Sequence, residues 1–150
     1  MSRFHHILVP LDFEDPSQEA LDVALALALV FDAKLTVFHA WDLPVYSYAG
    51  LSYLPPDVAA VVEEAADTSL ARVMALAIKS LPRAQSVLVR GSPAVEILDA
   101  AGRLKADLIV MGTHGRRGVS RMFLGSVAEK VVRSSPIPVL TIRVKQRPSA

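Results

Sequence analysis

Short apolar runs alternate along the chain with longer stretches in which apolar and polar positions recur at helical spacing. The run from Ile7 to Leu11 (ILVPL) is almost wholly apolar and ends at Asp12, as expected for a parallel strand covered on both faces. Runs of similar length recur, and together they predict five strands at residues 7–11, 35–41, 85–90, 107–111 and 138–144.

Four helices are predicted between these strands, at residues 16–31, 57–81, 93–104 and 126–134. For the first, Asp15 offers an N-cap and Gln18 the return partner of a capping box, and Ser92 offers a cap for the third. The second helix is expected to face the core through apolar positions at helical spacing, which are Val58, Val62, Ala65, Val73 and Leu76.

This alternation of strands and helices predicts an α/β fold. Crossovers of this length call for a parallel sheet with helices on both faces. A chain of 150 residues, 52% of them hydrophobic, suits one domain over residues 1–150. Residues 42–56, with three prolines and all three tyrosines, are predicted as a loop inside that domain, and residues 145–150 as a tail.

Charge and composition narrow the class of protein. The formal net charge of +1 predicts no nucleic-acid or membrane partner. Cysteine is absent, which excludes disulfides, thiolate zinc sites and thiol catalysis. The longest apolar stretch, from Ala20 to Ala33, is too short to cross a bilayer, and no signal peptide is recognised. A cytoplasmic protein is therefore expected.

The stretch from Val110 to Val127 is rich in glycine, with Gly112, Gly115, Gly118 and Gly125 close together. It follows a predicted strand, at the sheet edge where open parallel sheets bind ligands. Glycine backbone and the first N–H groups of a helix suit an anion, although the same residues can simply connect strand to helix. The nine residues between Gly115 and Gly125 exceed what a strand-to-helix connection needs. Neither a Walker nor a dinucleotide motif is present.

The spacing Gly112-x-x-Gly115, nine residues, Gly125-Ser126 resembles the G-2x-G-9x-G-[S/T] nucleotide signature of the universal stress protein family. The resemblance extends to residues 7–12, 91–97, 106–115 and 124–142. It implies a five-stranded sheet in the order 3-2-1-4-5, of the adenine nucleotide alpha hydrolase-like type. The first and fourth strands would then be neighbours beside the glycine segment.

The resemblance also implies the ATP-binding branch of that family, with ATP, ADP or AMP as ligand and Mg²⁺ as its possible companion. Carried over by motif match, the residues around the ribose and phosphates are Gly112, His114, Gly115, Gly125 and Ser126. Those at the adenine and ribose end are Pro10, Asp12, Ala40, Met111 and Val127. Arg116, inside the spacer, either pairs with phosphate or belongs to a solvated basic loop.

Several alternatives stay open for these residues. Asp12 can accept from a ribose hydroxyl, hold Mg²⁺ through water, or cap the turn that follows it. His114 is interpreted as a positioning group, so no catalytic residue is predicted. The three histidines His5, His6 and His39 are not expected to form a metal site, because neighbours in a strand point to opposite faces.

The function implied is a nucleotide-dependent stress-response switch acting on an unidentified protein partner, with at most weak ATPase activity. The alternatives are a slow Mg²⁺-dependent nucleotide hydrolase and a dimeric scaffold that needs no nucleotide. The apolar edge from Val139 to Val144 predicts a twofold homodimer, which is also how the family commonly assembles. The tyrosine-bearing loop at residues 42–56 either closes over the nucleotide or serves a partner.

Overall fold

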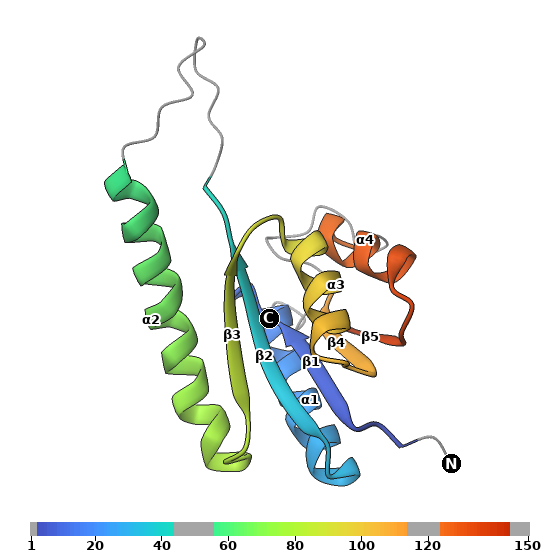
Figure 1. Ribbon diagram of the computed structural model, residues 1–150. Helices are drawn as coiled ribbons and strands as arrows, with labels where there is room; N and C mark the ends of the chain where they lie inside the picture. Colours follow the sequence, from blue (N-terminus) through green and yellow to red (C-terminus); the bar gives the residue numbers. More distant parts are fainter. Residues whose placement is uncertain (1–2, 44–55, 114–123, 145–150) are drawn as a thin grey trace, which may run out of the picture.

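The computed structural model of the chain, shown in Figure 1, describes residues 3–43, 56–113 and 124–144. A five-stranded sheet runs through its centre in the order β3-β2-β1-β4-β5, and every neighbouring pair is parallel. The strands are β1 (His6–Pro10), β2 (Lys34–Trp41), β3 (Gln85–Arg90), β4 (Leu108–Gly112) and β5 (Val139–Ile142). The predicted α/β fold and strand order are confirmed.

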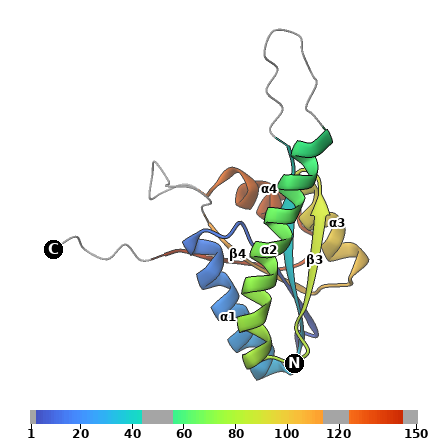
Figure 2. The same cartoon turned by 90° about the vertical axis from the view of Figure 1, so that its left-hand side faces the viewer.

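Helices cover both faces of the sheet. They are α1 (Asp15–Phe31), α2 (Pro56–Ser80), α3 (Pro93–Arg103) and α4 (Ser126–Ser134). Figure 2 shows α1 and α2 side by side on one face, while α3 and α4 lie on the other face in Figure 1. Since β2 and β3 extend the sheet on one side of β1 and β4 and β5 on the other, the strand order reverses between β1 and β4.

The two faces have separate apolar cores. Alternate residues of each strand point to opposite faces, so Ile7 and Val9 pack with α1 whereas Leu8 packs with α3 and α4. All three side chains are 0% exposed. Both faces of the central strands are thus covered, which explains why these strands are apolar runs without polar alternation.

The prediction for the buried face of α2 is partly wrong. The fully buried positions follow one i, i+4, i+11 stripe: Ala66, Leu70 and Ala77. Val73 packs partly against them, but Val58, Ala65 and Leu76 are exposed. Alanine and valine occur all around this helix, so its sequence supports more than one apolar stripe, and packing against β2 and β3 selects the stripe that is buried.

The predicted capping box of α1 is also wrong. Asp15 is the first helical residue, the N-cap is Glu14, and no side-chain hydrogen bond caps this end within the described residues. Ser92 does occupy the N-cap of α3, again without a side-chain cap bond there. Pro16 stands in the first turn of α1, where its missing N–H costs little.

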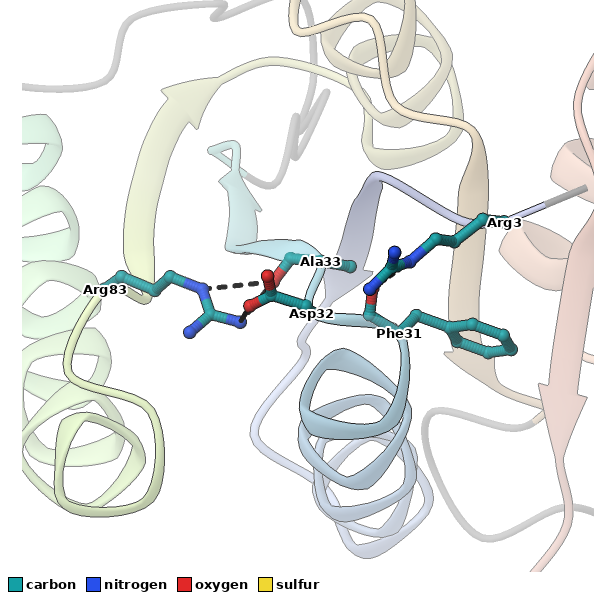
Figure 3. A network of polar contacts seen from close by, with 5 residues as sticks. All are labelled: Arg3, Phe31, Asp32, Ala33 and Arg83. Atoms are coloured by element: carbon teal, nitrogen blue, oxygen red, sulfur yellow. Dashed lines mark hydrogen bonds and ion pairs between the residues drawn. The ribbon is translucent and has the colours of Figure 1, made fainter.

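Two arginines bind the other end of α1, at the amino-terminal edge of the sheet (Figure 3). Nε of Arg3 donates to the carbonyl oxygen of Phe31 at 2.8 Å, and Nη2 of Arg83 donates to that of Ala33 at 3.2 Å. Nη2 of Arg83 also lies 3.0 Å from Oδ1 of Asp32, which ends the helix in the left-handed conformation. Positive charge at a helix C-terminus complements its dipole, so these contacts stabilise the turn into β2.

A half-buried histidine holds the amino ends of the strands together. Nδ1 of His6 donates to the carbonyl oxygen of Leu104 at 3.0 Å, and its Nε2 lies 2.8 Å from Oγ1 of Thr36. The carboxylate of Asp107 accepts from the backbone N–H groups of His5 and His6. This network joins β1, β2, the end of α3 and the start of β4.

The network predicts that the protein loses stability at mildly acidic pH. Burial lowers the pKa of His6, against the raising effect of its hydrogen bond to Leu104. As pH falls below the ordinary histidine value of about 6.5, the unfolded chain therefore binds more protons than the folded chain. Above that pH this contribution to the free energy of unfolding is complete, and it is lost as pH falls through the window below it.

The measurement is urea unfolding at about pH 7.5 and about pH 5.5 for the natural chain and His6→Asn. The free energy of unfolding is expected to decline less between these two pH values in His6→Asn than in the natural chain. His5→Asn, at an exposed neighbour, serves as the control and should keep the natural decline. An unchanged decline in His6→Asn would show that His6 does not cause the loss of stability at acidic pH.

Candidate functional site

A cavity of about 310 Å³ lies at the carboxyl ends of the strands, where β1 and β4 meet. It is enclosed by the ends of β1, β2 and β4 and by the first turns of α1, α3 and α4. In Figure 1 the end of β2 marks this edge, at the top of the sheet. Ligands of open parallel sheets bind at this kind of switch point, and the volume lies within the range of small-molecule sites.

Most of the cavity wall is apolar. Of its lining residues, Phe38, Ile97, Met111 and Ala128 are almost fully buried. Other apolar lining residues are Pro10, Leu11, Ala40, Pro93 and Val127. Removing a flat apolar ring from water into such a wall is favourable by roughly 25 cal/mol per Å² of apolar surface. This part of the cavity therefore suits an aromatic group.

The start of α4 lines the same cavity. Gly125 is its N-cap, and Ser126, Val127 and Ala128, which follow it, line the cavity. The first N–H groups of a helix have no acceptor within the helix, and they lie at the positive end of its dipole. An anion at this end would satisfy both.

The two ends of the glycine segment are tied together by the backbone. The N–H of Gly125 donates to the carbonyl oxygen of Thr113 at 2.5 Å, and the N–H of Thr113 donates to that of Ile142 at 3.0 Å. The end of β4 and the start of α4 are thereby held side by side at the cavity. The segment between them begins and ends at fixed points, although residues 114–123 lie outside the described residues.

A carboxylate lies at the cavity where β1 ends. Oδ1 of Asp12 accepts from the Ser17 hydroxyl at 2.7 Å and from the backbone N–H of Glu14 at 2.9 Å. Both Asp12 and Ser17 line the cavity, and Ser17 is only 5% exposed. Within the described residues Oδ2 of Asp12 has no hydrogen-bond partner. The carboxylate can therefore accept from a polar group of a ligand.

Gly112, which lines the cavity, also lies very close to the first turn of α1. A Cβ at this position would lie 2.6 Å from the carbonyl carbon of Pro16 and 2.8 Å from the backbone nitrogen of Ser17. The missing side chain thus lets the first turn of α1 approach the end of β4. The family resemblance placed this glycine beside the ribose and phosphates, which stays a prediction, and it gave no sign of this contact with the helix that carries Ser17.

Eight of the residues predicted to bind nucleotide line the cavity: Pro10, Asp12, Ala40, Met111, Gly112, Gly125, Ser126 and Val127. The other three, His114, Gly115 and Arg116, lie outside the described residues. That any of these residues contacts a nucleotide stays a prediction.

Sequence reasoning missed seven lining residues: Leu11, Ser17, Phe38, Pro93, Ile97, Thr113 and Ala128. Four of them, Leu11, Phe38, Ile97 and Ala128, carry ordinary core side chains, so no signal separated them from the rest of the interior. The position of Ser17 could have been recognised from the sequence. A serine on the first turn of a helix can hydrogen-bond to a residue at the end of the preceding strand, here Asp12.

Within residues 3–43, 56–113 and 124–144, no group of three or more His, Cys, Asp or Glu side chains could hold a metal ion. None of the helices there is long and apolar enough to cross a membrane.

Known proteins resemble this chain over nearly its whole length. The model of the universal stress protein family matches residues 3–143. "Universal stress protein in QAH/OAS sulfhydrylase 3′region" from Thermus aquaticus is 41% identical over 140 residues, which make up 93% of this chain and 99% of that protein.

Solved structures extend the comparison to the fold. Universal stress protein UspA from Lactobacillus plantarum has a TM-score of 0.73 at 28% identity, covering 95% of this chain and 100% of that one. A universal stress protein crystallised in complex with cAMP has a TM-score of 0.60 at 28% identity, covering 94% of this chain and 98% of that one. The sequence and fold similarities thus cover the same residues.

Proposed function

The chain belongs to the universal stress protein family, and from that premise we propose that its cavity binds an adenine nucleotide whose occupancy acts as a switch in the stress response. The observation that carries this proposal is the cavity at the β1–β4 switch point, which is lined both by apolar residues and by the first residues of α4. A nucleotide has an aromatic base and an anionic tail, and so it matches both.

The chemistry of the wall indicates which part of a nucleotide each region would hold. The base would lie against the apolar residues, among them Ala40 and Met111, and the phosphates near the start of α4 at Ser126. The ribose would then lie between them, beside Asp12. His114, Gly115 and Arg116 complete the phosphate end in this proposal, with Mg²⁺ as a possible companion of the phosphates. A relative was crystallised with cAMP, itself an adenine nucleotide, which supports this class of ligand.

Calorimetry of the full chain with ATP, ADP and AMP, with and without Mg²⁺, tests the proposal. We expect saturable binding of at least one of them below millimolar concentration, and mass spectrometry of freshly purified protein to detect a bound adenine nucleotide. No binding of any adenosine phosphate up to millimolar concentration would overturn it and leave the nucleotide-independent scaffold. ATP turnover above about 1 per second would instead favour the hydrolase.

A switch needs a partner surface, and we propose that a second copy of the chain covers the free edge of β5. This strand ends the sheet beside β4, and Leu140 on β5 and Val132 on α4 are exposed. Unpaired backbone groups on an apolar edge strand favour pairing with a second strand, and a twofold axis would satisfy both copies at once.

The proposed cytoplasmic location is supported by the absence of cysteine.

Leu140→Glu is expected to weaken this dimer by about a hundredfold, because each copy would bring a like charge into the proposed interface. Sedimentation equilibrium measures the change. Leu76→Glu is a matched control, since Leu76 is also an exposed leucine but lies on α2, and it should leave the dimer intact. Equal dimerisation of both variants would remove β5 from the interface.

A further inference from the structure

We propose that Ser17 is a positioning residue, which holds the carboxylate of Asp12 in place so that the site selects nucleotides that carry ribose hydroxyls. The inference rests on the proposed function, because it concerns how the same cavity would recognise its ligand. Ser17 is almost fully buried, touches the cavity and belongs to no part of the nucleotide signature.

The hydrogen bonds of Ser17 determine what it can do. Its hydroxyl lies 2.7 Å from Oδ1 of Asp12 and 3.0 Å from the carbonyl oxygen of Glu14. A hydroxyl has one proton, and the shorter contact to a charged acceptor is the stronger of the two. The same oxygen accepts from the backbone N–H of Asp12 at 3.2 Å. Ser17 thus contacts both the side chain and the backbone of Asp12.

A second feature holds the backbone next to Asp12. Phe13 has a φ of 64°, in the left-handed region that bulky residues rarely adopt. Its ring packs against the imidazole of His39, with 4.4 Å between ring centroids, and Nδ1 of His39 donates to the carbonyl oxygen of Leu11 at 2.6 Å. Such conformations persist where the surroundings hold them, and they concentrate at functional sites.

These contacts leave one carboxylate oxygen for a ligand. Oδ1 of Asp12 is occupied by Ser17 and Glu14, whereas Oδ2 has no partner within the described residues. A carboxylate only accepts hydrogen bonds, so its ligand partner must donate. A nucleotide placed with its base on the apolar wall and its phosphates at α4 presents ribose hydroxyls as such donors. A side chain fixed before binding loses less conformational entropy when the ligand arrives.

The test compares the binding of ATP and 2′,3′-dideoxy-ATP, which lacks both hydroxyls. Calorimetry is carried out on the natural chain, on Ser17→Ala, and on Thr36→Val as the matched control. Thr36 also has a buried hydroxyl, but it contacts His6 at the opposite edge of the sheet. Both variants lose a buried hydroxyl, and only Ser17→Ala loses the contact to Asp12.

The natural chain should prefer ATP over the dideoxy analogue by at least about tenfold, the size of a hydrogen bond to a charged group. Ser17→Ala should lower that preference by about threefold or more, with the affinity for the analogue almost unchanged. Thr36→Val should keep the natural preference. A structural role alone would instead weaken both ligands equally.

Two results would overturn the inference while the proposed function stands: a natural chain that binds both compounds equally, or a Ser17→Ala variant that keeps the full preference. A natural chain that binds neither compound would overturn the inference, and if it also bound neither ADP nor AMP the proposed function would be overturned with it.

Discussion

Gly112→Ala is expected to destabilise the protein by about 1–3 kcal/mol and to weaken nucleotide binding, even though it adds a single methyl group. The added Cβ would lie 2.6–2.8 Å from atoms of Pro16 and Ser17, two of which belong to the backbone. Backbone at the start of a helix cannot move aside as the end of a flexible side chain can. The first turn of α1 must therefore shift away from β4, and it carries the Ser17 contact to Asp12 with it.

Gly102→Ala provides a control of opposite sign. Gly102 lies in the last turns of α3, and a Cβ there would meet nothing within 4 Å. Alanine stabilises a helix relative to glycine by roughly 0.5–1 kcal/mol, so this variant should gain stability. Urea unfolding of both variants measures the two changes. A Gly112→Ala variant as stable as the natural chain would show that α1 does not depend on this close approach.

The role of Gly112 shows how far the glycine pattern could be interpreted without a structure. The spacing correctly located the edge of the sheet that carries the cavity, because a glycine segment after a buried strand must leave the sheet at its carboxyl end. It could not show which atoms approach each glycine. For Gly112 the close neighbour belongs to α1, almost a hundred residues earlier in the chain, and no local rule predicts such a contact.

The strands could be predicted because burial on both faces requires each residue of a strand to be apolar, whichever strand lies beside it. Apolar runs such as Ile7 to Leu11 are buried in this way. The strand order came from the family resemblance, because hydrophobic periodicity does not record which strands are neighbours. The face of α2 was predicted only in part, because Leu76 and Leu70 are equally apolar in sequence and only packing against the sheet distinguishes them.

The two edges of the sheet differ in the contacts they carry. At the amino ends, His6 and Asp107 join neighbouring strands through hydrogen bonds, and Arg3 and Arg83 bind the end of α1. At the carboxyl ends of β1 and β4 there is a cavity. Substitutions at the amino edge are therefore expected to change stability, whereas substitutions in the cavity wall should change binding.

Ala40→Trp applies this distinction to the proposed function and is expected to weaken ATP binding at least about a hundredfold. Ala40 lies on β2 and lines the cavity, which has a volume of about 310 Å³. An indole has a large apolar surface, and in this position it would occupy the space proposed for the adenine base. Because filling a cavity commonly stabilises a protein by about 0.5–2 kcal/mol, the variant should unfold at the same or a higher urea concentration.

The combination of lost binding and retained stability separates occlusion of the cavity from general damage to the fold. Ala75→Trp is the matched control, since Ala75 is exposed on α2 and the same substitution there should leave both quantities unchanged. If tryptophan at position 40 proves too large for the fold, Ala40→Leu repeats the test with a smaller side chain. ATP binding to a folded Ala40→Trp variant within about threefold of the natural affinity would mean that the base does not enter this cavity, because an indole and a purine cannot share the space.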